Sequence, residues 1–600
     1  MLFVYIVGTK LSQMIQQPTR LFDFIYHQEK QHPKEKCYNF KQNGTWHSIS
    51  TKEFIDSANT VSRALLQLGI KKGDKIAVIT SNNRPEWHAL DIGILQIGAH
   101  NVPLYPTLSS KDYGFILNHS DALYCFVSDA DLLEKVKAVQ ENTQLKGIFT
   151  FDEIEKETSW TSFLSLGNSM TSQTKVDVLK HSVSENDLAT IIYTSGTTGT
   201  PKGVMLSHKN IVQNTLVSAN ALDLETQDCR AVSYLPINHI FERFASYFYQ
   251  YRGIEVYFAE SIDQLGDNLK EIQPHFMPVV PRLLEKIFDK IVAKGAALSG
   301  IKKGLFFWAL QLAEGYKHYN KNTPWYAFKL GIARRLIFKK WRAAFGGHVR
   351  LMVSGSAPLQ ERLVTIFTAA GLPICEGYGM TETSPGVTIN DLRNKGLKVG
   401  TVGKALKDIS IKIAEDGEIL VKGSNVMMGY YKNEKLTKET IINGYLHTGD
   451  IGTLDAEGFL KITDRKKEMF KTSGGKYIAP AVLEQEFKKS RFIEQIMIIG
   501  EHQKMPAALI QVPIDVVNEW ARRHDYVIDD MTTDVKFLAK MQREIDSHNT
   551  HFGQWEQIKK FEITPDIWTI ADGHLTPTMK MRRKIITKKY AHLIEKIYNS

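Results

Sequence analysis

Short apolar runs alternate with amphipathic stretches along the first part of the chain. The runs at residues 75–81, 122–128 and 147–151 have the length and apolar content of buried strands. Between them, residues 84–98 and 130–139 repeat their apolar positions with the period of a helix. Strands that alternate with helices are typical of βαβ units, in which the strands are parallel and helices cover the sheet. The pattern therefore predicts an α/β fold with parallel sheets flanked by helices.

The same rhythm continues to about residue 390 and then changes. The strand-like run ATIIYTS (189–195) leads into a loop rich in Gly and Thr. Beyond Gly400 the runs are short and separated by glycines, as in GEILVKGS (417–424) and GFLKITDR (458–465), which is typical of small antiparallel sheets. The charged stretch DRKKEMFK (464–471) indicates a solvated connector.

These changes divide the chain into three predicted parts. A large N-terminal domain of several subdomains covers residues 1–463 and carries the parallel sheets. A hinge or linker covers residues 464–470, and a small, mobile α+β domain covers residues 471–600.

Composition indicates a folded protein of a reducing compartment. Of the 600 residues, 43 % are apolar and 23 % charged, which is enough apolar material for large cores. The four cysteines are scattered, so neither a disulfide framework nor a metal cluster is indicated. The apolar run from Leu2 to Val7 is shorter than the core of a signal peptide or a membrane span. We expect a cytoplasmic protein without a transmembrane helix; whether the first ten residues are the true start stays open.

The net charge of +10 is concentrated in one segment. Residues 301–350 contain eleven Lys and Arg and a single acid, Glu314, among many aromatic and aliphatic residues. This composition is typical of basic amphipathic helices on anionic lipid, and equally of packed helices with a solvated basic face. We hypothesise peripheral contact with the inner face of a membrane through this segment. Nucleic acid is not an expected partner, because no recognised nucleic-acid-binding motif is visible.

The strongest local motif is YTSGTTGTPKGVMLSH (193–208), which directly follows an apolar strand. Its glycines, its hydroxyl residues and Lys202 allow backbone amides, hydroxyls and an ammonium to converge on one polyanion. A Walker A loop would end in Gly-Lys-Ser/Thr, whereas here Pro201 precedes the lysine and Gly203 follows it. The motif predicts a phosphate-binding loop of a different kind.

This loop resembles that of the adenylate-forming enzymes, the family of acyl-CoA synthetases, firefly luciferase and peptide-synthetase adenylation domains. Further motifs of the family occur in the same order along nearly the whole chain. They are LPINHIFER (235–243), VSGSAPL (353–359), EGYGMTET (376–383), YLHTGD (445–450), ITDRKKEMFKTSGGKYIAP (462–480) and LTPTMKMRRK (575–584).

The resemblance implies an ATP site assembled from several motifs. Tyr378 would contact adenine, Thr381 would hold the α-phosphate, and Glu382 would place Mg²⁺, an ion that prefers oxygen ligands. Asp450 and Arg465 would bind the ribose, since a carboxylate suits two hydroxyls through charge-assisted hydrogen bonds. The implied ATP and AMP contacts are Thr194, Ser195, Gly196, Thr197, Thr198, Gly199, Lys202, Ser356, Ala357, Pro358, Glu376, Gly377, Tyr378, Gly379, Thr381, Asp450 and Arg465.

The resemblance also implies the catalytic residues. Lys580 would bridge the acid and the α-phosphate, where a cation offsets the repulsion of two anions, although Lys584 is a nearby competitor. His239 would line the acyl site, and Thr194 and Glu382 complete the implied catalytic set.

The second half-reaction implies a domain movement. The small domain would swing about the hinge residue Lys467 and replace Lys580 at the site by the loop of Ser473, Gly474 and Gly475. This loop would lie beside the pantetheine arm of CoA, because missing side chains let backbone approach a ligand closely. An ordinary surface turn is the alternative for the loop.

The acid is indicated by the segment at residues 239–253. It contains Glu242 but not the Asp with which amino-acid-activating members pair the substrate ammonium. Its HIFER string, with VPRLLEKI (280–287) and NVPLYPTLS (101–109), resembles long-chain fatty acyl-CoA synthetases. An apolar tunnel suits an alkyl chain, since each buried methylene contributes about 0.8 kcal/mol. We therefore predict a ligase that converts a long-chain fatty acid, ATP and CoA into acyl-CoA, AMP and pyrophosphate.

Three alternatives stay open at this point. One is a fatty acyl-AMP ligase that passes its product to a carrier protein. The second is an acid:CoA ligase for aryl or medium-chain acids, and the third is a non-catalytic lipid- or nucleotide-binding protein. The preferred chain length and the oligomeric state also stay open.

Overall fold

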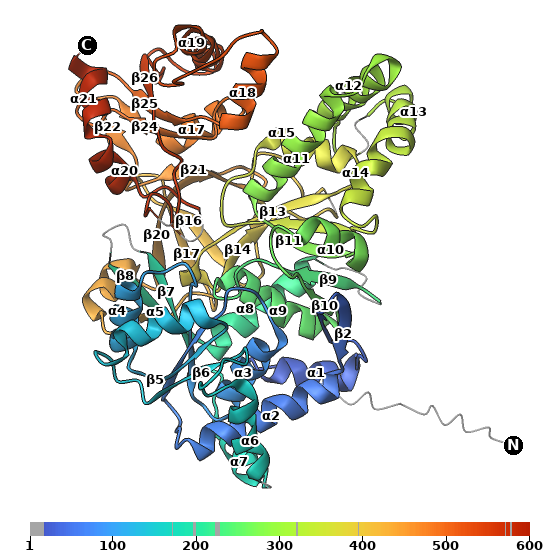
Figure 1. Cartoon of the computed structure of the whole chain (residues 1–600), viewed down its shortest axis with the longest axis vertical. Coiled ribbons are helices and arrows are strands. Elements are labelled where there is room, and N and C mark those ends of the chain that lie inside the picture. Colours follow the sequence, from blue (N-terminus) through green and yellow to red (C-terminus); the bar gives the residue numbers. More distant parts are fainter. Residues whose placement is uncertain are drawn as a thin grey trace, which may run out of the picture.

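The computed structural model describes residues 17–170, 172–195, 200–222, 228–319, 322–393, 395–570, 572–576 and 579–599. Of the predicted phosphate-loop residues, Gly196, Thr197, Thr198 and Gly199 lie outside this part, and only the backbone of Ser195 is described. The fold is α/β, as the sequence pattern predicts. Figure 1 shows the C-terminal elements, in orange and red, at the opposite end of the molecule from the N-terminal elements in blue.

A seven-stranded sheet carries the first βαβ units. Within the described residues its order is β18-β8-β7-β4-β3-β5-β6. The strands from β6 to β7 are parallel, and β8 and β18 add an antiparallel edge. Four of them confirm predicted strands. The bounds are β3 (Lys75–Ile79), β4 (His100–Leu104), β5 (Ala122–Val127), β6 (Gly147–Thr150), β7 (Leu188–Ser195), β8 (Pro201–Ser207) and β18 (Gly429–Tyr430).

A second, nine-stranded sheet has the order β15-β14-β13-β12-β11-β9-β10-β1-β2 among the described residues. Its strands from β13 to β1 are parallel, so their carboxyl ends meet at one edge. The bounds are β1 (Tyr38–Gln42), β2 (Thr45–Ile49), β9 (Arg230–Ser233), β10 (Glu255–Phe258), β11 (Phe276–Val279), β12 (Leu351–Ser354), β13 (Ile374–Gly379), β14 (Gly386–Ile389) and β15 (Lys404–Ala405).

Two helices join these sheets and shape the site. Helix α8 (His208–Leu222) contacts β8 of the first sheet and β14 of the second, and it packs on α9 (Ile240–Arg252). The side chain of His239 caps the start of α9. The helix ends at Gly253, which has φ +62° and lies so close to His32 that an added Cβ would be 2.4 Å from the His32 Cβ.

A buried ion pair anchors α9 to the first sheet. The Arg243 guanidinium is 2.6 Å from Asp91 Oδ1 on α3 (Pro85–Gln96) and donates to Thr190 Oγ1 on β7, also at 2.6 Å. Tyr247, one turn further along, donates its hydroxyl to the same carboxylate. Arg243 and Asp91 are both almost fully buried, so either charge without the other would be strongly destabilising.

The remaining helices of the large part cover the sheets. Around the first sheet lie α1 (Asp23–Gln31), α2 (Thr51–Gln67), α3 (Pro85–Gln96), α4 (Ser110–Ser120), α5 (Ala130–Gln140), α6 (Trp160–Ser169) and α7 (Thr174–Ser182). The second sheet is accompanied by α10 (Leu265–Ile272), α11 (Pro281–Ala296), α12 (Gly300–Glu314), α13 (Pro324–Ala333), a π-helical turn (Arg334–Phe338), α14 (Lys339–Ala344) and α15 (Glu361–Ala369). Figure 1 shows α12 and α13 as a helical projection at the upper right.

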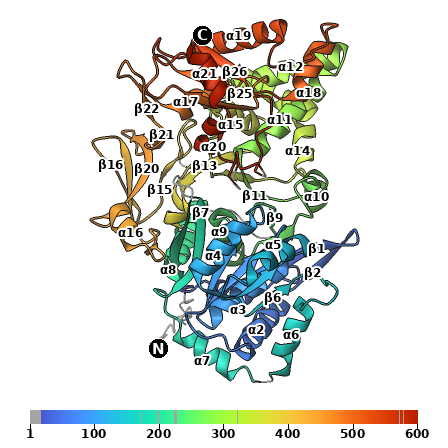
Figure 2. The same cartoon turned by 60° about the vertical axis from the view of Figure 1, so that its left-hand side comes forward.

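Beyond Gly400 the strands become short and antiparallel, which confirms the change predicted from the sequence. They form a separate sheet of β16 (Ser410–Ile413), β17 (Glu418–Lys422), β19 (Ile441–Ile442), β20 (Tyr445–Leu454) and β21 (Leu460–Arg465), accompanied by α16 (Glu434–Thr440). Figure 2 shows this sheet at one side of the molecule, below the C-terminal elements.

The C-terminal elements have an α+β arrangement with a core of their own. The strands are β22 (Phe470–Lys471), β23 (Tyr477–Ile478), β24 (Gln495–Ile499), β25 (Ala507–Gln511) and β26 (Lys560–Ile563). The helices are α17 (Pro480–Phe487), α18 (Ile514–Arg522), α19 (Val535–Asn549), α20 (Arg583–Lys589) and α21 (Ala591–Asn599). The domain boundaries at 463 and 471 stay predictions.

The C-terminal elements rest on the large part through polar contacts. Arg282 at the start of α11 forms an ion pair with Glu494 before β24. Gln485 of α17 donates to the Leu359 carbonyl at 3.3 Å. These contacts place the C-terminal segment over the carboxyl edge of the second sheet.

Candidate functional site

A cavity of about 1650 Å³ lies between the carboxyl edge of the second sheet, the end of β7 and the C-terminal elements. It brings together side chains from motifs that are up to several hundred residues apart in sequence. The predicted site residues that line it are Thr194, Lys202, His239, Ser356, Ala357, Pro358, Gly377, Tyr378, Gly379, Thr381, Glu382, Asp450, Arg465, Lys467 and Lys580.

Other predicted site residues do not line this cavity. Glu376 is buried on β13, and burial raises the pKa of its carboxyl to about 8. Ser473, Gly474 and Gly475 lie in the turn between β22 and β23, where Ser473 N donates to the Gln503 carbonyl at 2.8 Å. In this conformation the predicted CoA loop is therefore away from the cavity, while Lys580 is in it.

The predicted ribose contacts face each other on two paired strands. Asp450 of β20 is opposite Arg465 of β21, and their side chains are 3.4 Å apart between Oδ1 and Nε. The Tyr378 hydroxyl donates to Asp450 Oδ2 at 2.7 Å. Burial, and then the Asp450 charge, raise the pKa of Tyr378, so its hydroxyl keeps the proton that it donates. The predicted adenine and ribose contacts thus form one connected unit.

The predicted metal residue lies on the phosphate side of the cavity. Glu382 is in a 3-10 turn (Thr381–Thr383), and Tyr430 donates its hydroxyl to Glu382 Oε1 at 3.0 Å. The Lys202 ammonium lies over the Tyr430 ring, 5.6 Å from the ring centroid. Burial, and then the charge of Lys467, lower the pKa of Lys202, while the charge of Glu382 raises it. Among the described residues no group of three metal-ligating side chains occurs. One oriented carboxylate nevertheless fits Mg²⁺, which is commonly held by one or two carboxylates together with substrate phosphates.

Lys580 projects into the cavity from the C-terminal segment. Its side chain is still accessible to water, although protein atoms surround it closely enough for burial to lower its pKa to about 8. The charge of Arg465 acts in the same direction, while Asp450, Glu382 and Glu468 oppose it. Lys580 is therefore mainly protonated at neutral pH and is close to losing its proton just above it.

His239 is neutral at physiological pH. Burial, and then the charge of Lys580, lower its pKa to about 4. The backbone N–H of Phe241 donates to His239 Nδ1 at 3.2 Å, which leaves the ring proton on Nε2. The cap of α9 thus fixes both the position and the tautomer of the histidine.

The predicted hinge residue Lys467 lies between two residues that are anchored to different parts of the chain. Lys466 is tied to the antiparallel sheet through Glu418 Oε2 at 2.9 Å. Glu468 is tied to the C-terminal segment through Arg583 Nε at 3.1 Å. A rotation between the two parts would therefore be concentrated at Lys467, which is exposed.

Apolar side chains line one part of the cavity, here called the apolar channel, and the sequence analysis did not identify its walls. One wall is the face of α9 with Phe241, Phe244, Ala245 and Phe248; opposite it lie side chains of β11 and β12. The helical spacing of the four α9 positions was a usable signal in the sequence, but the strand residues carry none. Glu242 is outside the channel: it is buried, and Ser233 donates to it at 2.6 Å.

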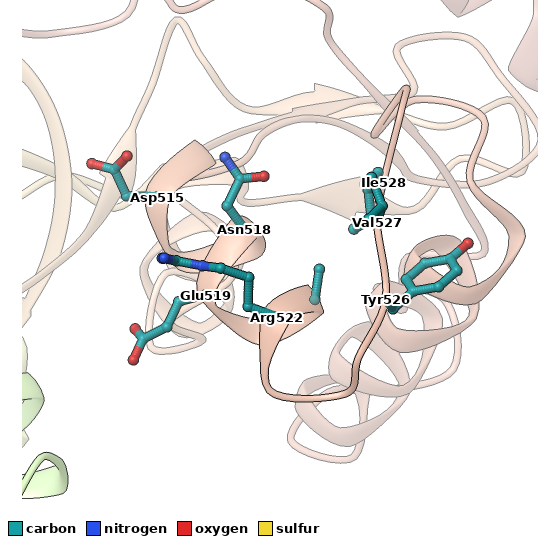
Figure 3. A pocket seen from close by; sticks show the side chains of 8 residues that line it. Asp515, Asn518, Glu519, Arg522, Tyr526, Val527 and Ile528 are labelled. Atoms are coloured by element: carbon teal, nitrogen blue, oxygen red, sulfur yellow. The ribbon is translucent and has the colours of Figure 1, made fainter.

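A second hollow, of about 580 Å³, lies on the C-terminal segment (Figure 3). The side chains around it include Asp515, Glu519 and Arg522 of α18 and Tyr526 in the loop that follows. It contains no residue predicted for the site. Among the described residues, none of the chemistry indicated by the sequence therefore falls at this second hollow.

The fold and this cavity define an AMP-binding enzyme, and the chain belongs to that family. The family model "AMP-binding enzyme" matches residues 25–431, and "AMP-binding enzyme C-terminal domain" matches residues 468–600. The resemblance found in the sequence is confirmed, and the chain is an enzyme of the acyl-CoA synthetase type.

Its curated relatives match over most of their length. The chain is 34 % identical over 591 residues to long-chain-fatty-acid–CoA ligase FadD15 of Mycobacterium tuberculosis, covering 96 % of each chain. It is 32 % identical over 601 residues to human long-chain-fatty-acid–CoA ligase 1, covering 92 % of this chain and 82 % of the human one. The ATP-bound structure of MatB from Rhodopseudomonas palustris is similar with a TM-score of 0.70 at 22 % identity, over 95 % of this chain and 99 % of that one, which shows the common fold.

Proposed function

We propose that this protein activates long-chain fatty acids to acyl-CoA in two steps through an acyl adenylate. The observation that carries the proposal is a single cavity in which the predicted nucleotide contacts and Lys580 meet the mouth of an apolar channel. The names of the curated relatives support a long-chain acid as the substrate. ATP and CoA are the co-substrates of this reaction.

In the first step a carboxylate oxygen of the acid attacks the α-phosphorus of ATP, and the bond to the bridging oxygen of the β-phosphate breaks. Asp450 and Arg465 hold the ribose, Tyr378 contacts the adenine and Thr381 the α-phosphate. Lys580, which lines the same cavity, offsets the repulsion between the two anions, and Lys202 binds the departing pyrophosphate. Glu382 would hold Mg²⁺ with the phosphates; the ion supplies further neutralisation of their charge.

In the second step the CoA sulfur attacks the acyl carbonyl carbon, a C–S bond forms, and the bond from the carbonyl to AMP breaks with loss of the thiol proton. The loop of Ser473, Gly474 and Gly475 must then reach the cavity. The anchoring of Lys466 and Glu468 to different parts of the chain supports a swing about Lys467. This swing removes Lys580 from the site after the adenylate has formed.

The proposal is tested by product analysis with the purified full-length chain. We expect release of pyrophosphate with ATP, magnesium and palmitate, followed by the thioester when free CoA is added. Lys580→Ala is the matched control, because it leaves the apolar channel intact. Accumulation of acyl-AMP without thioester would favour an acyl-AMP ligase, and a preference for aryl acids would favour a different acid:CoA ligase. No pyrophosphate release with any acid would favour a binding protein.

We also propose that the protein attaches peripherally to the inner, cytoplasmic face of a membrane through residues 301–350, which include α12, α13, the turn that follows and α14. Apolar side chains are exposed there, with 65 % of Trp325, 59 % of Phe328 and 52 % of Leu336 accessible to solvent. Exposed basic residues accompany them, including Lys339 and Lys340. Aromatic and basic side chains together favour an anionic lipid surface. None of the helices within the described ranges is long and apolar enough to cross a membrane.

This second proposal has its own experiment. Vesicles that contain anionic lipid should sediment the protein, and the charge reversal of Lys339 and Lys340 should weaken that binding. Reversal of Lys435 and Lys438, which are exposed on or beside α16, changes the net charge equally and should have little effect. Equal loss in both variants would mean that net charge alone attracts the lipid. Unchanged sedimentation of the first variant would refute the assigned surface.

A further inference from the structure

Two aromatic rings that line the apolar channel stack on each other. Phe248 of α9 and Phe276 of β11 stack with their centroids 5.5 Å apart and their planes at 27°. Both side chains line the channel and are almost fully buried, with 1 % and 5 % exposed. The ring of Tyr249 packs edge-on behind Phe276, at 5.8 Å. The rings therefore bridge the gap between the helix and the sheet.

We propose that the Phe248–Phe276 pair limits the straight part of the acyl channel and so sets how kcat/KM depends on the length of the acid. The inference rests on the proposed function and extends it to the residues that select among chain lengths. Above the pair, the channel passes Ala245 of α9, Pro278 of β11 and Val353 of β12. The small side chain of Ala245 leaves room there for an alkyl chain.

The strand register gives the depth of the straight part. Phe276 is paired with Leu351, and Val279 with Ser354, so Phe276 is four residues below the level of Gly355 at the cavity mouth. At about 3.3 Å per residue this corresponds to about 13 Å. Along α9, the seven residues from Phe241 to Phe248 give about 10 Å at 1.5 Å per residue.

Two independent elements thus agree on a straight channel of about 10 to 13 Å. With C–C bonds of about 1.5 Å, an extended alkyl chain advances about 1.3 Å per carbon. The straight part therefore holds about eight to ten carbons. A longer tail must turn away from the rings, and Ser218 and Leu222 of α8, which line the same cavity, lie on the route that it would take.

This geometry predicts a change of slope in the length dependence. Each methylene buried in the straight channel should raise kcat/KM by about fourfold, the factor that corresponds to full burial of one methylene. Beyond about ten carbons the gain per methylene should be smaller, because the tail has to bend. Long acids are still preferred, but the increase is steepest for the shorter ones.

The experiment measures pyrophosphate release with saturated acids of six to twenty carbons. Phe276→Ala and Phe248→Ala should extend the steep part to longer acids. The ratio of kcat/KM for the sixteen-carbon acid to that for the ten-carbon acid should rise about fifteenfold, as expected for about two more fully buried methylenes. Phe276→Leu should have a smaller effect in the same direction and keeps the test possible if the alanine variants do not fold.

Two further variants make the test specific. Ala245→Leu fills the channel about 6 Å from Phe241, four residues along α9, and should selectively lower kcat/KM for acids longer than about five carbons. Phe345→Ala removes the same atoms from a buried ring outside the channel and should leave the length profile unchanged.

The outcomes separate this inference from the proposed function. If the unaltered enzyme releases no pyrophosphate with any fatty acid, the proposed function fails. If it is active but the variants at Phe248 and Phe276 keep its length profile, the assignment of the rings is wrong. The same conclusion follows if Phe345→Ala changes the length profile as much as the variants at Phe248 and Phe276 do. The effect would then come from looser packing of the core in general.

Discussion

Lys580→Arg should abolish the alkaline decline of the adenylation half-reaction. Burial and the nearby charge of Arg465 lower the pKa of Lys580 to about 8, against an ordinary value of 10.5. The cation that offsets the two substrate anions is therefore lost as the pH rises through about 8. Arginine at this position stays protonated throughout, because its pKa exceeds about 12 even when it is perturbed.

The size of the effect follows from the titration. With a pKa of about 8, about 90 % of Lys580 is protonated at pH 7 and about 10 % at pH 9. If only the protonated form is active, kcat/KM for ATP should fall about tenfold per pH unit above pH 8. The arginine variant should be slower at pH 7, because its geometry differs, yet its profile should be flat to about pH 10.

The assay is pyrophosphate release in the absence of CoA, so that ionisation of the CoA thiol does not contribute. Arg465→Gln serves as a second perturbation: it removes a like charge near Lys580, so the decline should move to higher pH despite weaker ribose binding. If the arginine variant shows the same decline as the unaltered enzyme, another group titrates. If the unaltered enzyme shows no decline, the pKa of Lys580 is not lowered.

Three further predictions concern the domain swing, the magnesium site and the anchoring of α9. Lys580→Ala should lower adenylate formation by about 10²- to 10³-fold and largely spare thioester formation from supplied acyl-AMP, whereas Gly474→Leu should do the reverse. The structure has room for the leucine, since an added Cβ at Gly474 would lie 3.9 Å from its nearest neighbour. Equal damage to both steps in each variant would contradict the domain swing. Glu382→Ala should raise the magnesium concentration needed for half-maximal pyrophosphate release without changing the thermal melt; an unchanged magnesium titration would count against its role. Arg243→Met should lower the free energy of unfolding in urea by about 3–5 kcal/mol, because Asp91 would be left buried without its partner; a loss below about 1 kcal/mol would show that water reaches the carboxylate.

Much of the fold could be predicted because its strands are buried on both faces. The apolar runs at residues 75–81 and 122–128 correspond to β3 and β5, with ends that differ by one or two residues. The short strands β9 and β10, of four residues each, give no comparable signal. Their place in the second sheet depends on pairing between distant segments rather than on local pattern.

The candidate site likewise contains residues that the sequence predicts and residues that only the fold reveals. Short motifs identified Tyr378, Glu382 and Asp450 because each motif combines glycines with a chemically distinctive side chain. Tyr430, whose hydroxyl donates to Glu382, has no such motif. Its role becomes visible only in the fold, where strand β18 meets the 3-10 turn 48 residues earlier in the chain. The apolar channel could not be predicted because its walls come from helices and strands that only the folded chain brings together.

Helix α9 separates two tasks on two faces. On one face, Arg243 and Tyr247 bind the Asp91 carboxylate. On the other face, Phe244 and Phe248 line the cavity. Because helical geometry keeps these positions apart, substitutions on the cavity side leave the contacts of Arg243 and Tyr247 intact. During evolution such a helix can accumulate substitutions that change which acids the enzyme accepts, while the contacts that hold the helix in the fold stay the same.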